Sequence, residues 1–342
     1  MQYTPPAPRP SAAHAARSFS AQRRFTAVGA ACVLGLAALL PAHAQSWPTR
    51  QVTIISPYAP GGTNDVVARL LAERLQKAFG QPFVVDNKPG AAGILGATLV
   101  MRAAPDGYTL LSGNNGALVV QAVVKTPSPY DPATAFTSIV KIADAPNYVG
   151  ISADLPVNTV GELIALAKKE PGKLNYSSAG SGSFGNFMGE YFKLLTGTDI
   201  VHIPAKSSGP ALTEMMSGRI QMMIDPLVLS QRNGGRVKVL ATTNSARVDT
   251  YSDIPTIKES GGPEINIVGW FGLVGPANLP KDIVDKIEGV ARTMMADPEA
   301  RKTLTAAGLL PSLLTGAAFT TLVRDDVKRY TDVKVRANMV VE

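Results

Sequence analysis

Three glycines in the middle of the chain have the spacing of a phosphate-binding turn. Gly180, Gly182 and Gly185 form the motif G-x-G-x-x-G within the stretch NYSSAGSGSFGNFMGEYF. A strand-like run over 174–178 precedes the motif and a helix-like run follows it, which is the context of a dinucleotide-binding turn. The same geometry also suits other anions, because the first N–H groups of a helix have no partner within the helix.

The residues around the next expected strand argue against a dinucleotide. A dinucleotide fold places an acidic residue at the end of that strand, where it holds the ribose. Asp199 precedes the strand expected over 200–203, whereas Ala205 and Lys206 follow it. We therefore keep an NAD(P)-dependent oxidoreductase, exported by the twin-arginine route that the arginine pair at 23–24 would signal, only as an alternative.

A serine hydrolase is a third alternative, because a triad can be drawn from Ser181, His202 and Asp225. The G-x-S-x-G elbow of such enzymes is absent, since Ala179 and Ser183 occupy its glycine positions. His202 falls within an expected strand, which favours a hydrogen-bonded structural histidine. It has no companion ligands at metal spacing. We expect no catalytic residue, no metal and no cofactor.

The N-terminal 44 residues have the composition of a secretory signal peptide. Residues 1–24 contain four arginines and no acidic residue, an apolar run covers 25–40, and Ala42-His43-Ala44 follows. The apolar run is shorter than the roughly 20 residues of a membrane span. We expect cleavage after Ala44 and a periplasmic mature protein. The leader also contains Cys32, the one cysteine of the chain, so the mature protein forms no disulfide.

The net charge gives no sign of a nucleic-acid partner. The formal charge of +7 falls to +3 without the four arginines of the leader, and no basic stripe is present in the sequence. A mature chain of about 298 residues is long enough to be stable through its own core, in one or two domains.

The expected elements predict an α/β fold. Strands are expected over 52–56, 83–86, 108–112, 148–152, 174–178, 200–203, 220–224, 237–241 and 270–274, and helices over 65–79, 92–103, 160–169, 210–217, 281–296 and 317–330. Alternation of strands and helices predicts parallel sheets, whose ligands bind at the carboxyl ends of the strands. Loops rich in glycine, serine, threonine and asparagine follow four of these strands, at 61–63, 112–116, 179–183 and 207–210. Together they indicate a shared anion site.

Seven blocks of sequence, in order along nearly the whole mature chain, resemble the substrate-binding proteins of tripartite tricarboxylate transporters, the Bug-type receptors. The blocks are YAPGGTND at 58–65, VVDNKPGAAG at 84–93, PDGYTLL at 105–111, YDP at 130–132, PGKLNY at 171–176, SGPALT at 208–213 and WFGL at 270–273. The resemblance is more specific than one glycine motif because it spans the chain.

This resemblance implies a periplasmic-binding-protein type II fold, an α/β fold of two lobes with mainly parallel sheets and a ligand cleft between them. After the leader (1–44), the first lobe would comprise 45–146 and 270–342, and the second 147–269. The implied protein is a monomeric periplasmic receptor that captures a small organic carboxylate. It would deliver that ligand to the membrane subunits of a tripartite tricarboxylate-type transporter. It would be no enzyme and would bind no nucleic acid.

In this family, backbone groups and ordered waters from loops of both lobes hold the carboxylate. The corresponding loops here are 58–65, 112–115, 179–184 and 205–208, together with Asp225. The candidate ligand-binding residues are Tyr58, Pro60, Gly61, Gly62, Thr63, Asn64, Asp65, Ser112, Asn114, Asn115, Ala179, Gly180, Ser181, Gly182, Ser183, Phe184, Ala205, Lys206 and Asp225.

Some of these residues have structural explanations that stay open. Asp65 suits the first turn of a helix, Lys206 suits a solvated surface, and Asp225 suits a turn cap. Ala205 stands where the family often has tyrosine, which predicts extra space in the cleft. Either water or a bulkier ligand would fill that space.

Overall fold

The computed structural model describes residues 1–5 and 47–336. The residues on which the leader prediction depends, including Cys32, the arginine pair at 23–24 and the cleavage site after Ala44, lie outside the described part. Residues from Trp47 onward form one compact unit. Within the described residues, no helix has both the length and the apolar character that crossing a membrane requires.

The first of two β-sheets has six strands in the order β11-β4-β10-β3-β1-β2. Their bounds are β1 Val52–Ser56, β2 Phe83–Asn87, β3 Thr109–Asn114, β4 Phe136–Pro146, β10 Val268–Pro276 and β11 Leu310–Thr315. Strands β1, β2, β3 and β4 run in one direction, and β10 and β11 run in the other.

The second sheet has five strands in the order β7-β6-β8-β5-β9. Their bounds are β5 Tyr148–Ser152, β6 Asn175–Ser178, β7 Val201–Pro204, β8 Met222–Ile224 and β9 Val237–Thr242. Only β5 opposes the other four strands. The prediction of an α/β fold with two mainly parallel sheets is confirmed, because most strands within each sheet run in the same direction. The antiparallel neighbours arise because β5 and β10 lie in the middle of their sheets and β11 pairs with β4 at the edge of the first sheet.

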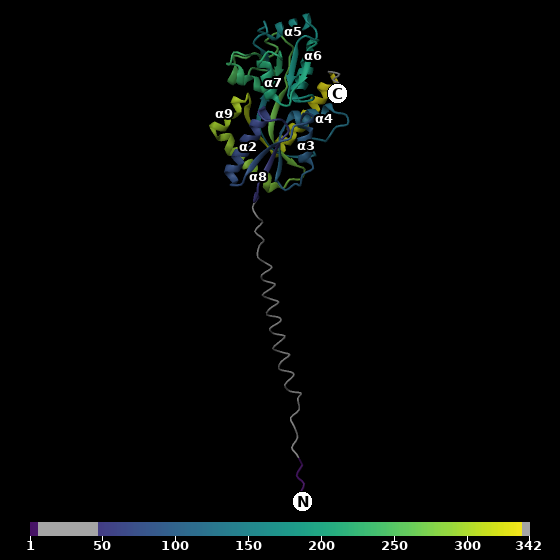
Figure 1. Ribbon diagram of the computed structural model, residues 1–342, viewed down its shortest axis with the longest axis vertical. Coiled ribbons are helices and arrows are strands. Elements are labelled where there is room, and N and C mark those ends of the chain that lie inside the picture. Colours follow the sequence, from purple (N-terminus) through teal and green to yellow (C-terminus); the bar gives the residue numbers. More distant parts are fainter. Residues whose placement is uncertain (6–46, 337–342) are drawn as a thin grey trace. The chain divides into compact units, whose positions relative to one another are not determined.

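Helices cover both sheets (Figure 1). The longer ones are α2 Thr63–Phe79, α3 Ile94–Met101, α5 Val160–Lys169, α6 Phe184–Thr196, α7 Ser208–Met216, α8 Lys281–Ala296, α9 Pro298–Ala306 and α10 Gly316–Arg336. Short turns are η1 Ala91–Gly93, the π-helical η2 Gly116–Val120, α4 Gln121–Val124, η3 Pro226–Gln231 and η4 Asp249–Tyr251. In Figure 1, α5, α6 and α7 gather in the upper part of this unit, and α2, α3 and α8 in the lower part.

Two adjacent strands connect the lobes. β4 continues through Asn147 into β5, and β10 begins beside the end of β4, with Val268 opposite Pro146. Thr243 ties the two connections together, because its hydroxyl accepts from Asn147 N (3.3 Å) and donates to Ile267 O (3.0 Å). Strand membership therefore changes from the first sheet to the second after β4, and back before β10. The exact lobe boundaries expected from the sequence stay a prediction.

One apolar core runs across both lobes. Trp270, Phe187 and Tyr330 are almost fully buried in a single cluster, although they come from β10, α6 and α10. The Trp270 indole packs edge-on against Phe319, with ring centroids 4.9 Å apart, and its N–H donates to Asp326 Oδ2 at 2.8 Å. Aromatic contacts of this kind stabilise a core beyond the area they bury.

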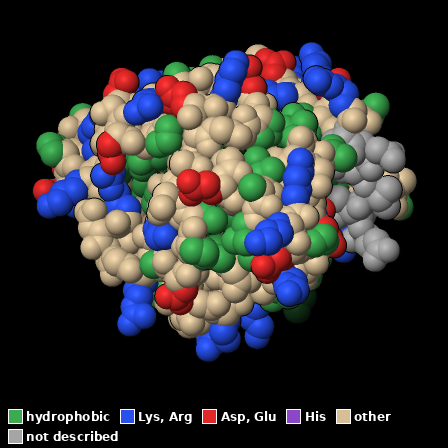
Figure 2. All heavy atoms as spheres, turned by 90° about the horizontal axis from the view of Figure 1, so that it is seen from above, with side chains coloured by type: hydrophobic (Ala, Val, Ile, Leu, Met, Phe, Trp, Pro, Cys, Tyr) green, Lys and Arg blue, Asp and Glu red, His purple; other side chains and the backbone are tan. Residues whose placement is uncertain are grey.

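The surface mixes charges of both signs. On the face drawn in Figure 2, lysine and arginine side chains are interspersed with aspartate and glutamate, and apolar side chains lie between them. That face therefore carries no continuous basic stripe of the kind that nucleic-acid binding requires.

Candidate functional site

A small cavity lies where helix starts from both lobes meet. Its volume is about 40 Å³, and we call it the inner cavity. It is lined by Tyr58, Gly62, Thr63, Asn64, Asn114, Asn115, Ala145, Asn147, Ala179, Ser183, Phe184, Gly185, Ser207, Ser208, Asp225, Pro226 and Phe271. The lining thus contains the starts of α2, α6, α7, η2 and η3.

Two of the α-helices among these begin without a side-chain cap. Gly62, which has no side chain to act as a cap, precedes α2, and Ser207, whose hydroxyl accepts no hydrogen bond from its helix, precedes α7. The first backbone N–H groups of a helix have no acceptor within the helix, and the N-terminal end of its dipole is positive. The inner cavity therefore offers backbone donors and a favourable potential to an anion.

Two buried hydroxyls in the lining of the inner cavity also lack hydrogen-bond partners. Thr63 is 2% exposed and Ser207 is 1% exposed, and neither hydroxyl forms a hydrogen bond in the described structure. Buried polar groups are normally satisfied, so these two mark places where a ligand or a water belongs. No lysine, arginine or histidine is among the described residues that line the inner cavity. An anion there would be held by neutral donors.

The amide side chains mostly hold the walls in place. Asn64 accepts from the Ser56 hydroxyl at 2.9 Å and donates to Ser112 O at 3.0 Å. Asn115 donates to the Tyr330 hydroxyl at 3.1 Å and accepts from Trp270 N at 3.3 Å. These bonds orient the starts of α2 and η2 towards the same cavity.

Asp225 supplies the one carboxyl group of the described lining. Its carboxylate accepts from the Ser208 hydroxyl at 2.6 Å and from Leu227 N at 2.8 Å, so it caps η3. Burial raises the pKa of Asp225 to about 6, against the two hydrogen bonds, which lower it. Asp225 therefore caps a turn, as one interpretation of the sequence held, and it also lines the cavity, while its contact with a ligand stays a prediction.

A larger hollow adjoins the inner cavity. We call it the outer depression, and its volume is about 540 Å³. It is lined by Tyr58, Pro89, Gly90, Ala91, Ala92, Gly93, Ala179, Gly180, Ser181, Ala205 and Lys206. Tyr58 and Ala179 belong to both linings. Burial raises the pKa of Tyr58, and its hydroxyl donates to Ala92 O at 3.3 Å.

Most residues proposed from the sequence fall around these two spaces. Those at the inner cavity are Tyr58, Gly62, Thr63, Asn64, Asn114, Asn115, Ala179, Ser183, Phe184 and Asp225. Gly180, Ser181, Ala205 and Lys206 line only the outer depression. Pro60, Gly61, Asp65, Ser112 and Gly182 line neither.

Asp65 has a structural role within the first lobe. Its carboxylate accepts from Gly61 N at 3.2 Å, Asn87 Nδ2 at 3.0 Å and Arg69 Nε at 2.9 Å. With its oxygens engaged in this way, Asp65 ties the loop before α2 to the end of β2. The structural explanation considered from the sequence therefore describes its position best.

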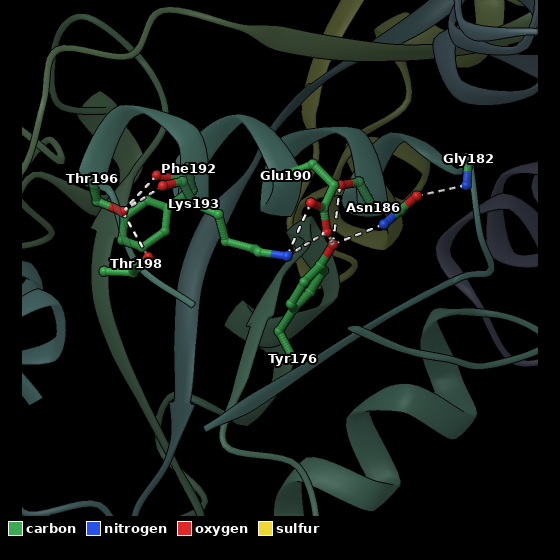
Figure 3. A network of polar contacts seen from close by, with 8 residues as sticks. All are labelled: Tyr176, Gly182, Asn186, Glu190, Phe192, Lys193, Thr196 and Thr198. Atoms are coloured by element: carbon green, nitrogen blue, oxygen red, sulfur yellow. Dashed lines mark hydrogen bonds and ion pairs between the residues drawn. The ribbon is translucent and has the colours of Figure 1, made fainter. Parts of the chain in front are cut away.

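A network of hydrogen bonds in the second lobe holds the glycine turn at Gly182 in place (Figure 3). Gly182 N donates to Asn186 Oδ1 at 2.7 Å, and Asn186 Nδ2 donates to the Tyr176 hydroxyl at 2.8 Å. Tyr176 in turn donates to Glu190, which pairs with Lys193. Because Gly182 N–H already has a partner, it is not free to hold a pyrophosphate or another anion. No observation here favours the dinucleotide alternative.

The three residues of the possible hydrolase triad, Ser181, His202 and Asp225, do not contact one another in the way a triad requires. His202 Nε2 lies 2.8 Å from Ser178 Oγ, and its ring lies 4.7 Å from that of Tyr176. Burial lowers the pKa of His202, so the ring is neutral at pH 7. Asp225 pairs with Ser208 instead, and Ser181 is exposed. Among the described residues there is also no group of three potential metal ligands.

Five residues that line the inner cavity lie outside the loops proposed from the sequence, and Ser207 and Ser208 lie within the proposed loop 205–208 but were not among the candidate residues. Ala145, Asn147 and Phe271 come from the connection between the lobes, and Gly185 and Pro226 from the first turns of α6 and η3. β4 was not predicted as a strand, so its end was not placed beside the cleft. Phe271 lies in the block WFGL at 270–273, and this block was the one sequence signal that could have identified any of these five residues.

Two α/β lobes around a small cavity suited to an anion define a solute-binding protein. The chain belongs to the family of tripartite tricarboxylate transporter family receptors, whose sequence profile matches residues 67–338. The resemblance drawn from the seven sequence blocks is thereby confirmed. The family is one of receptors.

Relatives of known structure have the same fold. An R. palustris protein solved with adipate is 34% identical with a TM-score of 0.81, covering 85% of this chain and 98% of that one. MatC from Rhodopseudomonas palustris, solved with bound malate, is 29% identical with a TM-score of 0.79, covering 84% and 99%. BugT of Bordetella pertussis is 31% identical over 302 residues, which are 87% of this chain and 92% of BugT.

Proposed function

We propose that this protein is a periplasmic receptor that captures a small organic carboxylate in the inner cavity. It would deliver the carboxylate to the membrane subunits of a tripartite tricarboxylate-type transporter. The observation that carries the proposal is the meeting of the uncapped starts of α2 and α7 with the unpartnered hydroxyls of Thr63 and Ser207. Adipate and malate in the two R. palustris relatives support a carboxylate ligand.

The hydrogen-bond donors of the inner cavity are sufficient for micromolar affinity. A hydrogen bond to a charged group contributes about 1.5–3 kcal/mol, and a helix N-terminus adds about 0.3–1 kcal/mol. Micromolar binding requires about 8 kcal/mol. A few such bonds, less the cost of ordering the ligand and closing the lobes, reach this range.

A thermal-shift screen tests the ligand class. Purified protein is heated with organic acids, neutral solutes of similar size and organic cations. A carboxylate that binds only the folded protein should stabilise it by about 2.7 kcal/mol at a hundredfold excess over Kd. If only neutral or cationic solutes raise the melting temperature, the carboxylate proposal is wrong.

Export and delivery need separate tests. The intact mass of protein recovered from the periplasm should correspond to a monomer that begins at Gln45; a retained leader or a lipid on Cys32 would contradict this. Cells that lack the protein should lose uptake of the labelled acid, and the gene supplied in trans should restore it. Unchanged uptake would instead favour a role in sensing.

A further inference from the structure

We propose that a groove between α2 and α8, on the first lobe and apart from the ligand-binding spaces, is a docking surface for the transporter. The occupant that we infer is a segment of a membrane subunit that carries acidic side chains beside an apolar anchor. The inference rests on the proposed function, and it names a partner surface that the ligand site does not include.

The groove has a volume of about 570 Å³, and we call it the helix groove. In Figure 1, α2 and α8 both lie in the lower part of the unit. Thr63 at the start of α2 lines the inner cavity, whereas Lys77 near its end lies about 20 Å further along the helix axis, at 1.5 Å per residue. A partner bound here is therefore separate from the ligand. The helix groove is lined by Arg74, Lys77, Ala78, Lys286, Gly289, Val290, Thr293, Met294 and Asp297, none of which lines the inner cavity or the outer depression.

The helix groove carries positive charge that the described residues do not neutralise. Arg74 is neutralised, because its guanidinium group pairs with Asp297. Lys77 is exposed and has no hydrogen bond or ion pair among the described residues. Lys286 Nζ donates to Trp47 O at 3.2 Å, which positions the ammonium group without neutralising it. These two lysines favour an acidic partner and would also speed its approach.

The surface between the charged groups is apolar. Ala78 of α2 and Val290 and Met294 of α8 line it, and the flexible methionine side chain can adapt to what packs against it. An apolar strip with cations at its rim suits an amphipathic protein segment. A lipid surface or a nucleic acid would need a wider basic face, but the neighbouring Lys281 and Arg292 are paired with acidic residues of their own helix.

Packing within the chain does not explain Gly289. It lies inside α8, where glycine destabilises a helix relative to alanine, and nothing lies within 4 Å of the position that its Cβ would take. Every other glycine of the described α-helices has a neighbour within that distance: Gly96, Gly161, Gly185, Gly189, Gly209 and Gly316. The missing side chain keeps the wall of the helix groove open, so a partner backbone can approach α8 closely.

Uptake by cells, with ligand affinity measured separately, tests the proposal. Lys77→Glu reverses a charge at the rim, and Gly289→Leu fills the helix groove. In cells that lack the native protein, each variant should lower uptake about fivefold or more relative to the wild type. The labelled acid is the one that raises the melting temperature most. Its Kd for the purified variants should equal that of the wild type, and Lys77→Arg should keep wild-type uptake.

Lys168→Glu and Ala165→Leu, on α5 of the second lobe, are the matched controls. Lys168 resembles Lys77 because both are exposed basic residues in the last turn of their helices. Ala165 is exposed on its helix, so leucine there adds the same bulk to a surface outside the helix groove. Both controls should leave uptake and Kd as in the wild type.

A photo-cross-linking residue in place of Ala296 identifies the occupant, because Ala296 is exposed beside Asp297 at the end of the helix groove. In cells it should link to a membrane subunit, at a peptide that contains acidic residues, and Lys77→Glu should remove the product. A link to a second copy of this chain, or no link to a membrane protein, would overturn the proposal.

The outcomes separate this inference from the proposed function. If both groove variants support wild-type uptake, the helix groove is no docking surface and the receptor proposal stands. If the wild type itself restores no uptake, the proposed delivery fails instead. Should a groove variant accumulate poorly in the periplasm, the cross-link from Ala296 in the otherwise wild-type protein decides.

Discussion

At the scale of single residues, the inner cavity holds two buried hydroxyls without a hydrogen-bond partner, those of Thr63 and Ser207. The Thr63 hydroxyl is buried and has no partner in the described structure, although it stands in the first turn of α2. Leaving a buried hydroxyl unpaired costs about 1–3 kcal/mol of stability. A ligand that accepts a hydrogen bond from Thr63 would recover this free energy.

Thr63→Val should therefore separate affinity from stability. Loss of a hydrogen bond to a bound carboxylate should weaken binding about 10- to 100-fold. The free energy of unfolding without ligand should stay the same or rise, because an unpaired hydroxyl is removed. Calorimetry and urea denaturation measure the two effects. Thr303→Val, on an exposed site of α9, is the control, and equal losses of affinity in both variants would contradict a role for Thr63.

Asp225 should make binding depend on pH. Its pKa is about 6 before an anion enters the inner cavity, and a nearby carboxylate would raise it further because like charges repel. Binding is therefore accompanied by proton uptake, and Kd should fall severalfold as the pH drops from 8 to 6. Asp225→Asn should flatten this dependence. A wild-type Kd that does not change over the same range would show that the ligand lies away from Asp225.

At the scale of elements, the starts of α2 and α7 lie close together. A Cβ atom built on Gly62 would lie 3.3 Å from Ser207 Cβ and 3.5 Å from Ser208 N. The backbone of Gly62 has a φ of −94°, so the glycine is needed for space and not for conformation. The short distance between these helix starts is what makes the inner cavity so small.

Gly62→Ala should weaken ligand binding at least tenfold without unfolding the protein. The added methyl group separates the two helix starts, so their N–H groups no longer converge on one anion. Gly289→Ala in α8 is the matched control, since nothing lies within 4 Å of its added Cβ. It should leave Kd unchanged and stabilise the helix by about 0.5–1 kcal/mol. Circular dichroism checks folding; wild-type affinity of Gly62→Ala would show that these two helix starts do not close on the ligand.

At the scale of the whole molecule, one core links the two lobes through the aromatic contacts of α6 and α10. Phe187 and Tyr330 lie with ring centroids 5.4 Å apart, one from each lobe. Asp326 is buried beneath this core, and burial raises its pKa to about 6 despite its bond from Trp270. Asp225 and Asp326 are thus two buried acids whose pKa values lie above the ordinary range.

These two acids should make the protein more stable at pH 5 than at pH 7. Their folded pKa values exceed the unfolded values, so the native state binds more protons between pH 4 and 6, and this stability is lost as the pH rises through 6. Together they should add about 2–3 kcal/mol at pH 5. His202, whose pKa is lowered, opposes part of this gain. Urea denaturation at both pH values measures the difference, and Asp225→Asn should reduce it by about 1 kcal/mol.

Much of this architecture is predictable from the sequence. The bounds of β1, β5, α5 and α8 agree with the expected ranges, because apolar periodicity and turn residues mark their ends. The strands β4 and β11 were not predicted from the sequence. β4 contains Lys141 and Asp144, whose charges interrupt the apolar pattern and are accommodated by their mutual ion pair and by a hydrogen bond from Lys141 to Ser312 Oγ at 3.0 Å.

The sequence by itself determined which loops place glycine, serine and threonine at helix starts, because these residues shape the local backbone. The tertiary structure alone decided which of their groups remain free. Asp65 and the N–H of Gly182 are engaged by Arg69 and Asn186, whereas the hydroxyls of Thr63 and Ser207 have no partner. Arg69 and Asn186 each lie only four residues from the group they engage, but the tertiary surroundings decide whether a side chain turns towards such a group, so local pattern cannot predict the difference. The division into a small inner cavity and a large outer depression likewise depends on how closely two separate lobes pack.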